Sequence, residues 1–201
     1  MARIKSGDKR SALLEAAIVE FAARGVWSTP TSAISKAAGV AEGTLFTYFA
    51  SKDVLLNALY REIKRELADV MLSAYPAQAD ARTRLEHIWK QYVHWGVAQP
   101  ARFNVMSQLR MSEQVTQDSR DIGAAPFAAL DALARDSIAR RIIRDQPVAF
   151  IAGMLGAMAE ATMLFVAGAS SAANGCLPGD AAAFDYCAAG FDTFWRGIAV
   201  T

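Results

Sequence analysis

The chain has 201 residues, of which 53% are hydrophobic and 20% are charged, and its formal net charge is +1. This length and composition suit one large domain or a small domain joined to a larger one, and they exclude an intrinsically disordered chain. The charge is uneven, because residues 1–65 contain ten Lys/Arg and six Asp/Glu, whereas residues 66–201 contain eleven and fourteen. The basic N-terminal part and the mildly acidic remainder indicate that only the N-terminal part binds a polyanion.

The cysteines and the N-terminus predict a reduced, cytoplasmic setting. Cys176 and Cys187 are the two cysteines, which is too few for a disulfide framework, and neither has metal-ligand spacing to a histidine. The apolar run after the charged N-terminus is broken by Glu15 and Glu20, so we expect no signal peptide. Residues 148–169 are as long and apolar as a membrane span, but Glu160 lies among them and no second span follows. We therefore expect a helix buried inside a soluble protein.

The first part of the chain predicts short helices separated by glycine. A helix from about Asp8 to Gly25 has an apolar face at i, i+3, i+4 and i+7, formed by Leu14, Ala17, Ile18 and Phe21. Thr29 is expected to cap the second helix, with Pro30 at its first position, and this helix ends at Gly39.

The third segment, VAEGTLFTYFASK (residues 40–52), combines aromatic and hydroxyl-bearing side chains. Ser51 then caps a longer helix over residues 52–72.

The rest of the chain also predicts helices, so the expected fold class is all-α. We place these helices at residues 80–98, 100–111, 117–145, 147–170 and 179–199, and prolines lie between or inside them. Gly123 with Pro126 is expected to kink or split the helix at 117–145. No internal repeat interrupts this pattern.

The second and third helices, joined by a tight turn at Gly39, predict a helix-turn-helix, whose second helix can enter a DNA major groove. Leu45 and Phe49 are four residues apart and face the core. The opposite face then carries groups that can meet bases or phosphates: Glu42, Gly43, Thr44, Thr47 and Tyr48. The alternative is a three-helix packing unit that binds no nucleic acid.

These residues resemble the DNA-binding domain of the TetR/AcrR family of bacterial transcriptional regulators. The segments that match are AAIVEFAARG and ISKAAGVAEGTLFTYFASKDVLL, within residues 10–60, and the rest of the chain is similar in length and helical pattern. The resemblance implies a three-helix DNA-binding domain at residues 1–51 and a larger helical effector-binding and dimerisation domain at residues 52–201, connected by the helix at 52–72. It also implies a homodimer that binds a palindromic operator, usually as a repressor released by a small effector.

Carried onto this sequence, the DNA-facing positions of the family are Thr31, Ser32, Glu42, Gly43, Thr44, Phe46, Thr47, Tyr48 and Lys52. Three residues depart from the family pattern. Ser32 stands where a basic residue is common, Ala41 replaces a capping serine, and Glu42 would repel phosphates unless it accepts a hydrogen bond from a cytosine amino group. The basic N-terminal arm, with Arg3, Lys5, Lys9 and Arg10, either supplies charge or is a solvated tail.

In the helix at 147–170, small residues recur every four positions. This pattern predicts that another helix packs closely against that side. The resemblance implies a four-helix interface between two subunits, made by the last two helices of each. The residues assigned to it are Ala149, Gly153, Ala157, Ala161, Phe184, Phe191, Phe194 and Trp195. The alternative is that these helices pack only within one subunit.

Aromatic and methionine side chains predict a deformable apolar pocket for the effector. The candidates are Trp89, Tyr92, Trp95, Phe103, Met106, Phe127, Met158 and Glu160, any of which can instead be simple core. Glu160 needs a partner, either a ligand or an arginine such as Arg102 or Arg110. His87 and His94 share a helix face without a third strong ligand, so no metal site is predicted, although either can hydrogen-bond a ligand.

No motif for catalysis or for a cofactor is apparent: the chain has no nucleophile elbow and no glycine loop for phosphates. The expected partners are a double-stranded DNA operator, a second copy of the chain and a small, largely apolar effector, with no membrane. Two alternatives stay open. One is a helical ligand-binding or interaction module with weak or lost DNA binding, and the other is a transcriptional activator.

Overall fold

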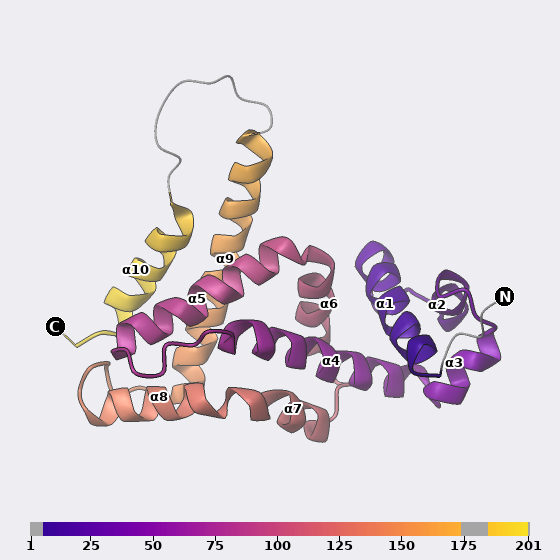
Figure 1. Cartoon of the computed structure of the whole chain (residues 1–201), viewed down its shortest axis with the longest axis horizontal. Helices are drawn as coiled ribbons and strands as arrows, with labels where there is room; N and C mark the ends of the chain where they lie inside the picture. Colours follow the sequence, from indigo (N-terminus) through magenta and orange to yellow (C-terminus); the bar gives the residue numbers. More distant parts are fainter. Residues whose placement is uncertain (1–5, 174–184, 201) are drawn as a thin grey trace. The chain divides into compact units, whose positions relative to one another are not determined.

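The structure is a computed structural model that describes residues 6–173 and 185–200. The described residues form ten α-helices and one 3-10 helix and contain no strand, so the all-α prediction is confirmed (Figure 1). Contacts divide the chain into two compact units. One contains the described residues up to Glu66 together with Gln99–Ala125, and the other contains Leu67–Ala98 and the described residues from Pro126 onward. The functional boundary at residues 51 and 52 stays a prediction, because compactness does not show where a function ends.

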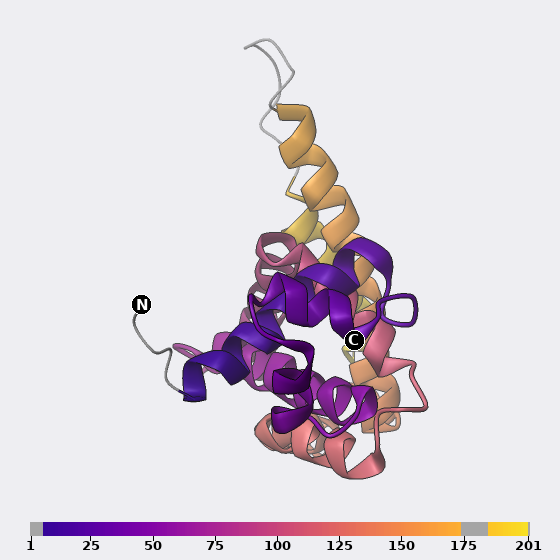
Figure 2. The same cartoon turned by 90° about the vertical axis from the view of Figure 1, so that its right-hand side faces the viewer.

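The first unit begins with three helices that share one small core. These are α1 (Ser6–Arg24), α2 (Thr31–Ala37) and α3 (Glu42–Tyr48), which lie toward the viewer in Figure 2. Their apolar side chains are almost fully buried: Leu13, Phe21, Ile34, Leu45 and Phe49. Gly25 and Gly39 end α1 and α2 with φ of 84° and 66°, a conformation that residues with a Cβ rarely adopt. The two glycine stops therefore lie where the sequence predicts them.

The start of α2 differs from the prediction, because Thr29 does not cap it. The N-cap is Pro30, which makes no side-chain cap hydrogen bond, and the helix begins at Thr31. The buried Thr29 hydroxyl instead donates to the Gly25 carbonyl oxygen at 2.8 Å. It thereby satisfies a carbonyl that the end of α1 leaves free, so Thr29 closes the preceding helix rather than opening the next.

Helix α4 (Lys52–Leu72) has the predicted bounds, and its residues belong to both units. Ser51 caps it as expected, with the Val54 amide donating to the Ser51 hydroxyl at 3.2 Å. Helices α6 (Pro100–Arg110) and α7 (Gln117–Ala124) complete the first unit. The side chain of Asn57 joins α4 to the segment before α7, because it donates to the Gln114 carbonyl at 2.7 Å and accepts from the Thr116 amide at 2.9 Å.

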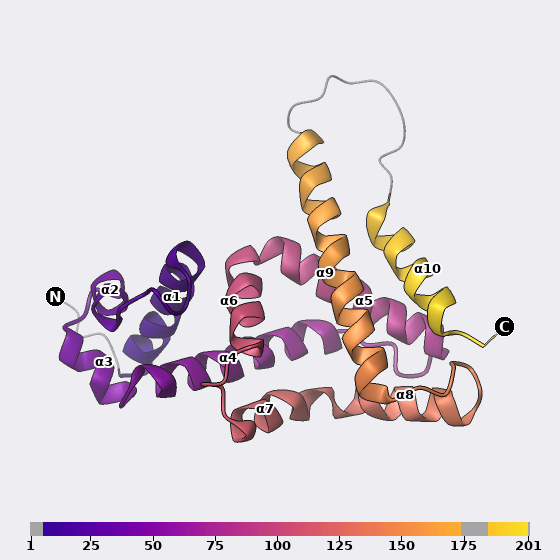
Figure 3. The ribbon, with the colours of Figure 1, turned by 180° about the vertical axis from the view of Figure 1, so that it is seen from behind.

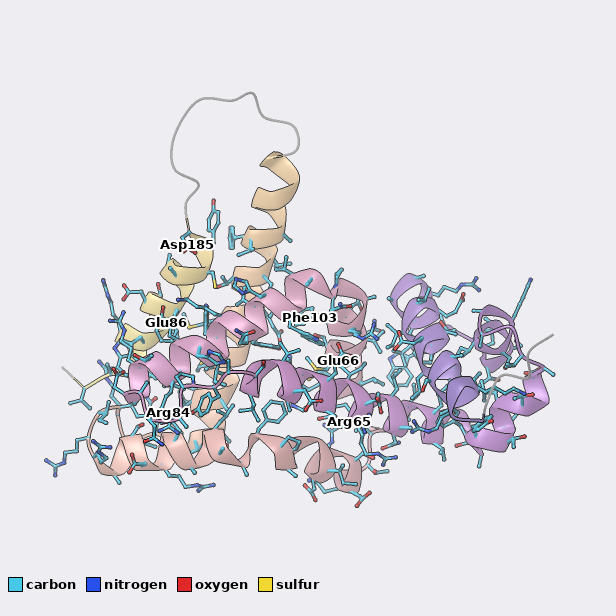
Figure 4. All side chains as sticks on the ribbon, viewed as in Figure 1. Arg65, Glu66, Arg84, Glu86, Phe103 and Asp185 are labelled. Atoms are coloured by element: carbon cyan, nitrogen blue, oxygen red, sulfur yellow. The ribbon has the colours of Figure 1, made fainter. Side chains whose placement is uncertain are left out.

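Two side chains of α6 hold α1 and the loop after it. Arg102 pairs with Glu15 of α1 at 2.6 Å and with Glu66 of α4 at 2.8 Å, and Figure 4 labels Glu66. The Gln108 side-chain oxygen accepts a hydrogen bond from the Val26 amide at 3.0 Å. Helix α6 thus helps to position α1 and the loop that follows it.

The second unit is built around Trp89. It contains α5 (Ala81–Ala98), α8 (Ala128–Ala139), α9 (Val148–Ala173) and α10 (Tyr186–Ile198), and α5, α9 and α10 pack side by side (Figures 1 and 3). The Trp89 ring is fully buried and stacks on Phe194 with centroids 6.0 Å apart. Its Nε1 donates to the Cys187 carbonyl oxygen at 2.9 Å. The indole therefore fills the core and also satisfies its polar atom.

The predicted helix at 117–145 is split and ends early. Near Gly123 and Pro126 it divides into α7, a 3-10 turn (Ala125–Phe127) and α8, as the sequence suggested. The end at residue 145 is wrong, because α8 stops at Ala139 and Arg141 adopts a φ of 57°. The chain then pairs with the end of α10, where Ile143 and Ala199 form an isolated antiparallel bridge.

Helix α9 is less buried than the sequence predicts. Residues Val148–Gly168 are long and apolar enough to cross a membrane, with a mean hydropathy of 1.8, yet only 22% of the apolar window is buried in the single chain. The burial expected for this helix is therefore only partial within the single chain. One side of α9 packs on its neighbours and another side exposes apolar residues to solvent.

Two glycines of α10 allow a direct test of how tightly it packs. A Cβ at Gly190 would lie 2.5 Å from the Thr162 hydroxyl and 2.8 Å from Trp89 Cζ2, whereas a Cβ at Gly197 would meet nothing within 4 Å. We expect Gly190→Ala to lower the free energy of unfolding by about 1–3 kcal/mol, because a rigid indole must move. The matched control, Gly197→Ala, should be neutral or stabilising by up to about 1 kcal/mol. Urea denaturation measures both, and equal effects would contradict this packing.

Candidate nucleic-acid interface

Helix α3 divides its residues between the core and solvent as the sequence predicts. Leu45 is fully buried, and Phe49 just after the helix is 2% exposed. The candidate contact residues on the other side are exposed or half-buried: Glu42, Gly43, Thr44, Phe46, Thr47 and Tyr48. The N-cap is Ala41, which provides no side-chain hydrogen bond. The first amides of α3 therefore have no side-chain partner at this cap.

The two threonines of α3 differ in what their hydroxyl groups do. The Thr47 hydroxyl donates to the Gly43 carbonyl oxygen at 3.0 Å, within its own helix. The Thr44 hydroxyl makes no hydrogen bond to any residue that the structure describes. Thr44 can therefore both donate to and accept from an external group, whereas Thr47 offers its methyl group and remaining lone pairs. Chemically, Thr44 is the better candidate for reading a base edge.

Gly43 has no internal reason to be glycine. Its backbone is not in the left-handed region, and a Cβ there would meet no atom within 4 Å. Glycine also lowers helix stability compared with alanine. Close approach of an external group to the backbone at the start of α3 would explain the residue, because a side chain would block it.

Lys52 lies at the start of α4 and is engaged with the loop between α1 and α2. Its Nζ donates to the Thr29 carbonyl oxygen at 2.7 Å and to the Trp27 carbonyl oxygen at 3.4 Å, and it lies 5.7 Å from the centroid of the Phe21 ring. Burial lowers the pKa of Lys52, and the neighbouring Asp53 opposes this shift. Because an ammonium group has three N–H donors, one remains for another partner. Lys52 thus positions the loop, a role that the sequence did not predict.

A hollow of about 520 Å³ lies beside Lys52, and it includes a residue that the sequence analysis missed. Its lining combines the loop and the ends of α3 and α4: Trp27, Ser28, Thr29, Pro30, Thr31, Phe46, Ala50, Ser51 and Lys52. Trp27 and Phe46 are 53% and 45% exposed. A tryptophan two residues before Thr29 was the signal available in the sequence, and the structure shows that its ring is exposed, as large rings at contact surfaces often are.

Basic groups lie near this surface, although part of the predicted arm falls outside the described residues. The guanidinium group of Arg10 lies 5.6 Å from the centroid of the Phe49 ring, next to the end of α3. Lys36 is exposed at the end of α2, and Ser32 is exposed near its start. Arg3 and Lys5 lie outside the residues that the structure describes. Arg10 is therefore a cation beside the end of α3, and it packs on an aromatic ring of the core.

The predicted dimer residues fall into two groups. The small residues of α9 are exposed: Ala149, Gly153, Ala157 and Ala161. Phe191 and Phe194 are each 2% exposed because they pack on Trp89 in their own chain, so assigning them to the interface is wrong. Trp195 is half-buried and stacks on Phe191, and Phe184 lies outside the described residues.

The predicted effector residues are likewise divided. Trp89 is core, because its ring and its Nε1 are both satisfied by the same chain. In the second unit, the Tyr92 hydroxyl donates to Glu160 Oε1 at 3.4 Å, which gives that carboxylate a partner. Trp95 in the same unit is buried, and Phe127 and Met158 are half-buried. Phe103, labelled in Figure 4, is half-buried and Met106 is buried, and both belong to the first unit. Arg102, one expected partner of Glu160, pairs with Glu15 and Glu66 instead.

The two histidines lie in different surroundings. His94 is exposed, and the His87 ring packs edge-on against Tyr75 with centroids 6.0 Å apart. Among the described residues, no group of three or more His, Cys, Asp or Glu side chains is placed to hold a metal ion.

A family model described as "Bacterial regulatory proteins, tetR family" matches residues 13–59, which include α2, α3 and the start of α4. The "Fatty acid metabolism regulator protein" of Bacillus subtilis (strain 168) is 32% identical over 73 residues. That match spans 36% of this chain and only 38% of the relative.

Solved structures extend the similarity to nearly the whole chain. A tetR family transcription regulator from Shewanella sp. PV-4 superposes with a TM-score of 0.82 and 26% identity, covering 96% of this chain and 99% of the other. The fatty acid degradation regulator FadR from Bacillus halodurans has the same fold, with a TM-score of 0.67 and 19% identity over 96% of this chain and 95% of that one. Helix-turn-helix geometry, family match and whole-chain similarity agree: residues 13–59 match the tetR family of bacterial regulatory proteins, and the chain as a whole has the fold of a tetR family transcription regulator.

Proposed function

We propose that this protein is a DNA-binding transcriptional regulator that acts as a homodimer in the cytoplasm and responds to a small effector. The observation that carries the proposal is the division of α3, whose inner side chains are buried while Gly43, Thr44 and Tyr48 remain accessible on the other side. A short helix with polar, accessible residues after a tight glycine turn has the chemistry to read a major groove. The proposal assigns no catalytic role.

The exposed side of α9 supports the homodimer. Beyond the small residues, this side presents large apolar side chains: Phe150 at 53% exposure, Met154 at 40% and Leu164 at 76%. Such a contiguous apolar surface is unfavourable in water and suits a second copy of the chain. A twofold arrangement would also let two copies of α3 enter successive major grooves, which are about 34–36 Å apart. We therefore propose a palindromic operator.

We propose that the effector is small and largely apolar, and that its binding releases DNA, as in a repressor. Support for a fatty-acid-derived effector comes from the names of relatives, which include a fatty acid metabolism regulator and a fatty acid degradation regulator. The contacts between α6 and α1 could transmit the effect of ligand binding to the DNA-binding helices. Because Arg102 and Gln108 of α6 hold α1 and its following loop, a displacement of α6 would move the surface that carries Trp27.

Selection of bound sequences from random double-stranded DNA tests the function. We expect enrichment of an inverted repeat whose half-sites are one helical turn apart, and loss of binding when decanoate or decanoyl-CoA is added. Failure to enrich any sequence would favour the second candidate function, a helical ligand-binding module without DNA binding. The exposed Glu42 in the first turn of α3 is the observation that favours this alternative, because a carboxylate repels phosphates.

Gly43→Ala separates folding from DNA binding. A methyl group at this position meets no atom of the protein within 4 Å, so we expect the variant to be as stable as the wild type or more stable by up to about 1 kcal/mol. DNA binding should weaken at least tenfold, because the methyl group would occupy the space needed by the DNA backbone. Thermal denaturation and fluorescence anisotropy measure the two effects. A variant that binds DNA as tightly as wild type would contradict the proposed close approach.

Thr44→Val and Thr47→Val distinguish base reading from general contact. Both changes replace a hydroxyl by a methyl group, but the Thr47 hydroxyl is already bonded to Gly43. We expect Thr44→Val to lower affinity for the preferred operator by about 1–3 kcal/mol and to change which base is preferred at one position per half-site. Thr47→Val should have a smaller effect. Equal losses for both variants on every sequence would contradict this assignment.

Ala157→Glu tests the dimer. Ala157 lies in the middle of the exposed side of α9, where a buried carboxylate without a partner would strongly oppose association. Ala152→Glu is the control, because Ala152 is also exposed but lies about 140° around the helix from Ala157. By light scattering at micromolar concentration, we expect the wild type and Ala152→Glu to have dimer masses and Ala157→Glu a monomer mass. A monomeric wild type would refute the homodimer.

A further inference from the structure

The loop between α1 and α2 carries an exposed tryptophan on a well-bonded backbone. The Val26 amide donates to Gln108 Oε1 at 3.0 Å, and the Trp27 carbonyl oxygen accepts from Lys52 Nζ at 3.4 Å. The Thr29 carbonyl oxygen accepts from the same ammonium group at 2.7 Å. The backbone is therefore held before, at and after Trp27, while the indole ring is 53% exposed. A large ring in water on an ordered loop is suited to contact with a partner, because the loop need not be ordered on binding.

The hollow of about 520 Å³ beside Lys52 connects this ring to the proposed recognition helix. Trp27 and Phe46 both line it, and Phe46, which is 45% exposed, belongs to α3. Among the residues that line the hollow, none is acidic and Lys52 alone is basic. The hollow thus combines two exposed aromatic rings with one positive charge.

Polar groups at the hollow keep unused hydrogen-bonding capacity. The Lys52 ammonium group uses two of its three N–H donors on the loop carbonyls. The Trp27 indole N–H and the Thr31 hydroxyl make no hydrogen bond within the part of the chain that the structure describes. An indole N–H and an ammonium group can only donate. Two such donors, one of them charged, at a hollow without carboxylates are complementary to an anionic oxygen.

The backbone of duplex DNA offers both kinds of group that this surface fits. Its phosphates are anionic acceptors, and the deoxyribose rings between them present apolar C–H groups. A free anion would satisfy the donors but leave the two rings in water, whereas an apolar ligand would bury the ammonium group without a charged partner. Because Phe46 lies on α3, DNA that reaches this helix also reaches the hollow.

We propose that Trp27 contacts the DNA backbone: its ring packs on a deoxyribose, and its indole N–H donates to an adjacent phosphate that also pairs with Lys52. This contact rests on the proposed function and adds to it a residue of the loop, outside α3. It positions the duplex without reading a base, since every nucleotide has the same sugar and phosphate. Trp27 is therefore expected to strengthen binding to all duplexes equally.

Fluorescence anisotropy of the full-length protein with two labelled duplexes tests this contact. One duplex has the sequence enriched from random DNA, and the other has the same length and an unrelated sequence. We expect Trp27→Ala to weaken binding to both about tenfold, the loss typical of removing a hydrogen bond to a charged group. The ratio of the two affinities should stay as in the wild type, because no base contact is lost.

Ile122→Ala is the matched control. Ile122 is an apolar residue of α7 that is 49% exposed and does not line the hollow, so both affinities should equal those of the wild type. Unchanged affinity of Trp27→Ala for both duplexes would overturn the backbone contact. A loss confined to the enriched duplex would also overturn it, because Trp27 would then read a base.

A phosphate scan tests the shared phosphate and does not require Trp27→Ala to fold. Each phosphate of the enriched duplex is replaced in turn by a neutral methylphosphonate, and binding is measured for the wild type and for Trp27→Phe, which keeps a ring but lacks the indole N–H. We expect one position in each half-site where the replacement weakens the wild type about threefold more than Trp27→Phe, since the two changes remove the same interaction. Identical profiles for the two proteins would overturn the assignment.

The backbone contact and the proposed function fail in different ways. A wild-type protein that binds the enriched duplex, together with a Trp27→Ala variant that binds it as tightly, would refute the contact and leave the proposed function intact. A folded wild-type protein that binds neither duplex would refute both.

Discussion

The shortness of α2 and α3 is the constraint on which the N-terminal half of the structure depends. Each has seven residues, and helices of that length are not stable alone in water. They form because Ile34, Leu45 and Phe49 are buried, with α2 packed on both α1 and α3, and because Gly39 turns the chain tightly between α2 and α3. The inner sides of both helices are thus committed to folding, and this leaves the outer side of α3 available for recognition. Folding and recognition thus use opposite sides of α3.

The parts of the fold that sequence reasoning predicted well are those set by local chemistry. Gly25 and Gly39 end helices because their backbone conformations disfavour other residues, and Ser51 caps α4 because its hydroxyl reaches an amide three residues on. Thr29 carries the same kind of signal but makes a different bond, since the end of α1 lies close enough to accept it. A capping pattern identifies a residue that can satisfy a helix end, but tertiary structure decides which end.

The candidate site was harder to predict where a residue has a role in the tertiary structure. The periodicity of α3 separates inner from outer side chains, but it does not show that Lys52 holds the loop that carries Trp27. Similarly, Phe191 and Phe194 have the pattern expected of an interface helix, and Trp89 has that of a pocket residue. The three rings pack on one another within a single chain, and no spacing in the sequence distinguishes this arrangement from contact with a partner or a ligand.

The four tryptophans of the chain are unevenly distributed, and Trp27 is the only one in the first unit. Trp89 and Trp95 are buried and Trp195 is half-buried, all in the second unit. An aqueous quencher such as iodide would therefore reach Trp27 far more readily than the buried indoles. The intrinsic emission of the unlabelled protein thus contains a water-accessible component that comes mainly from the loop beside α3, and any macromolecule that covers this loop should shield that component selectively.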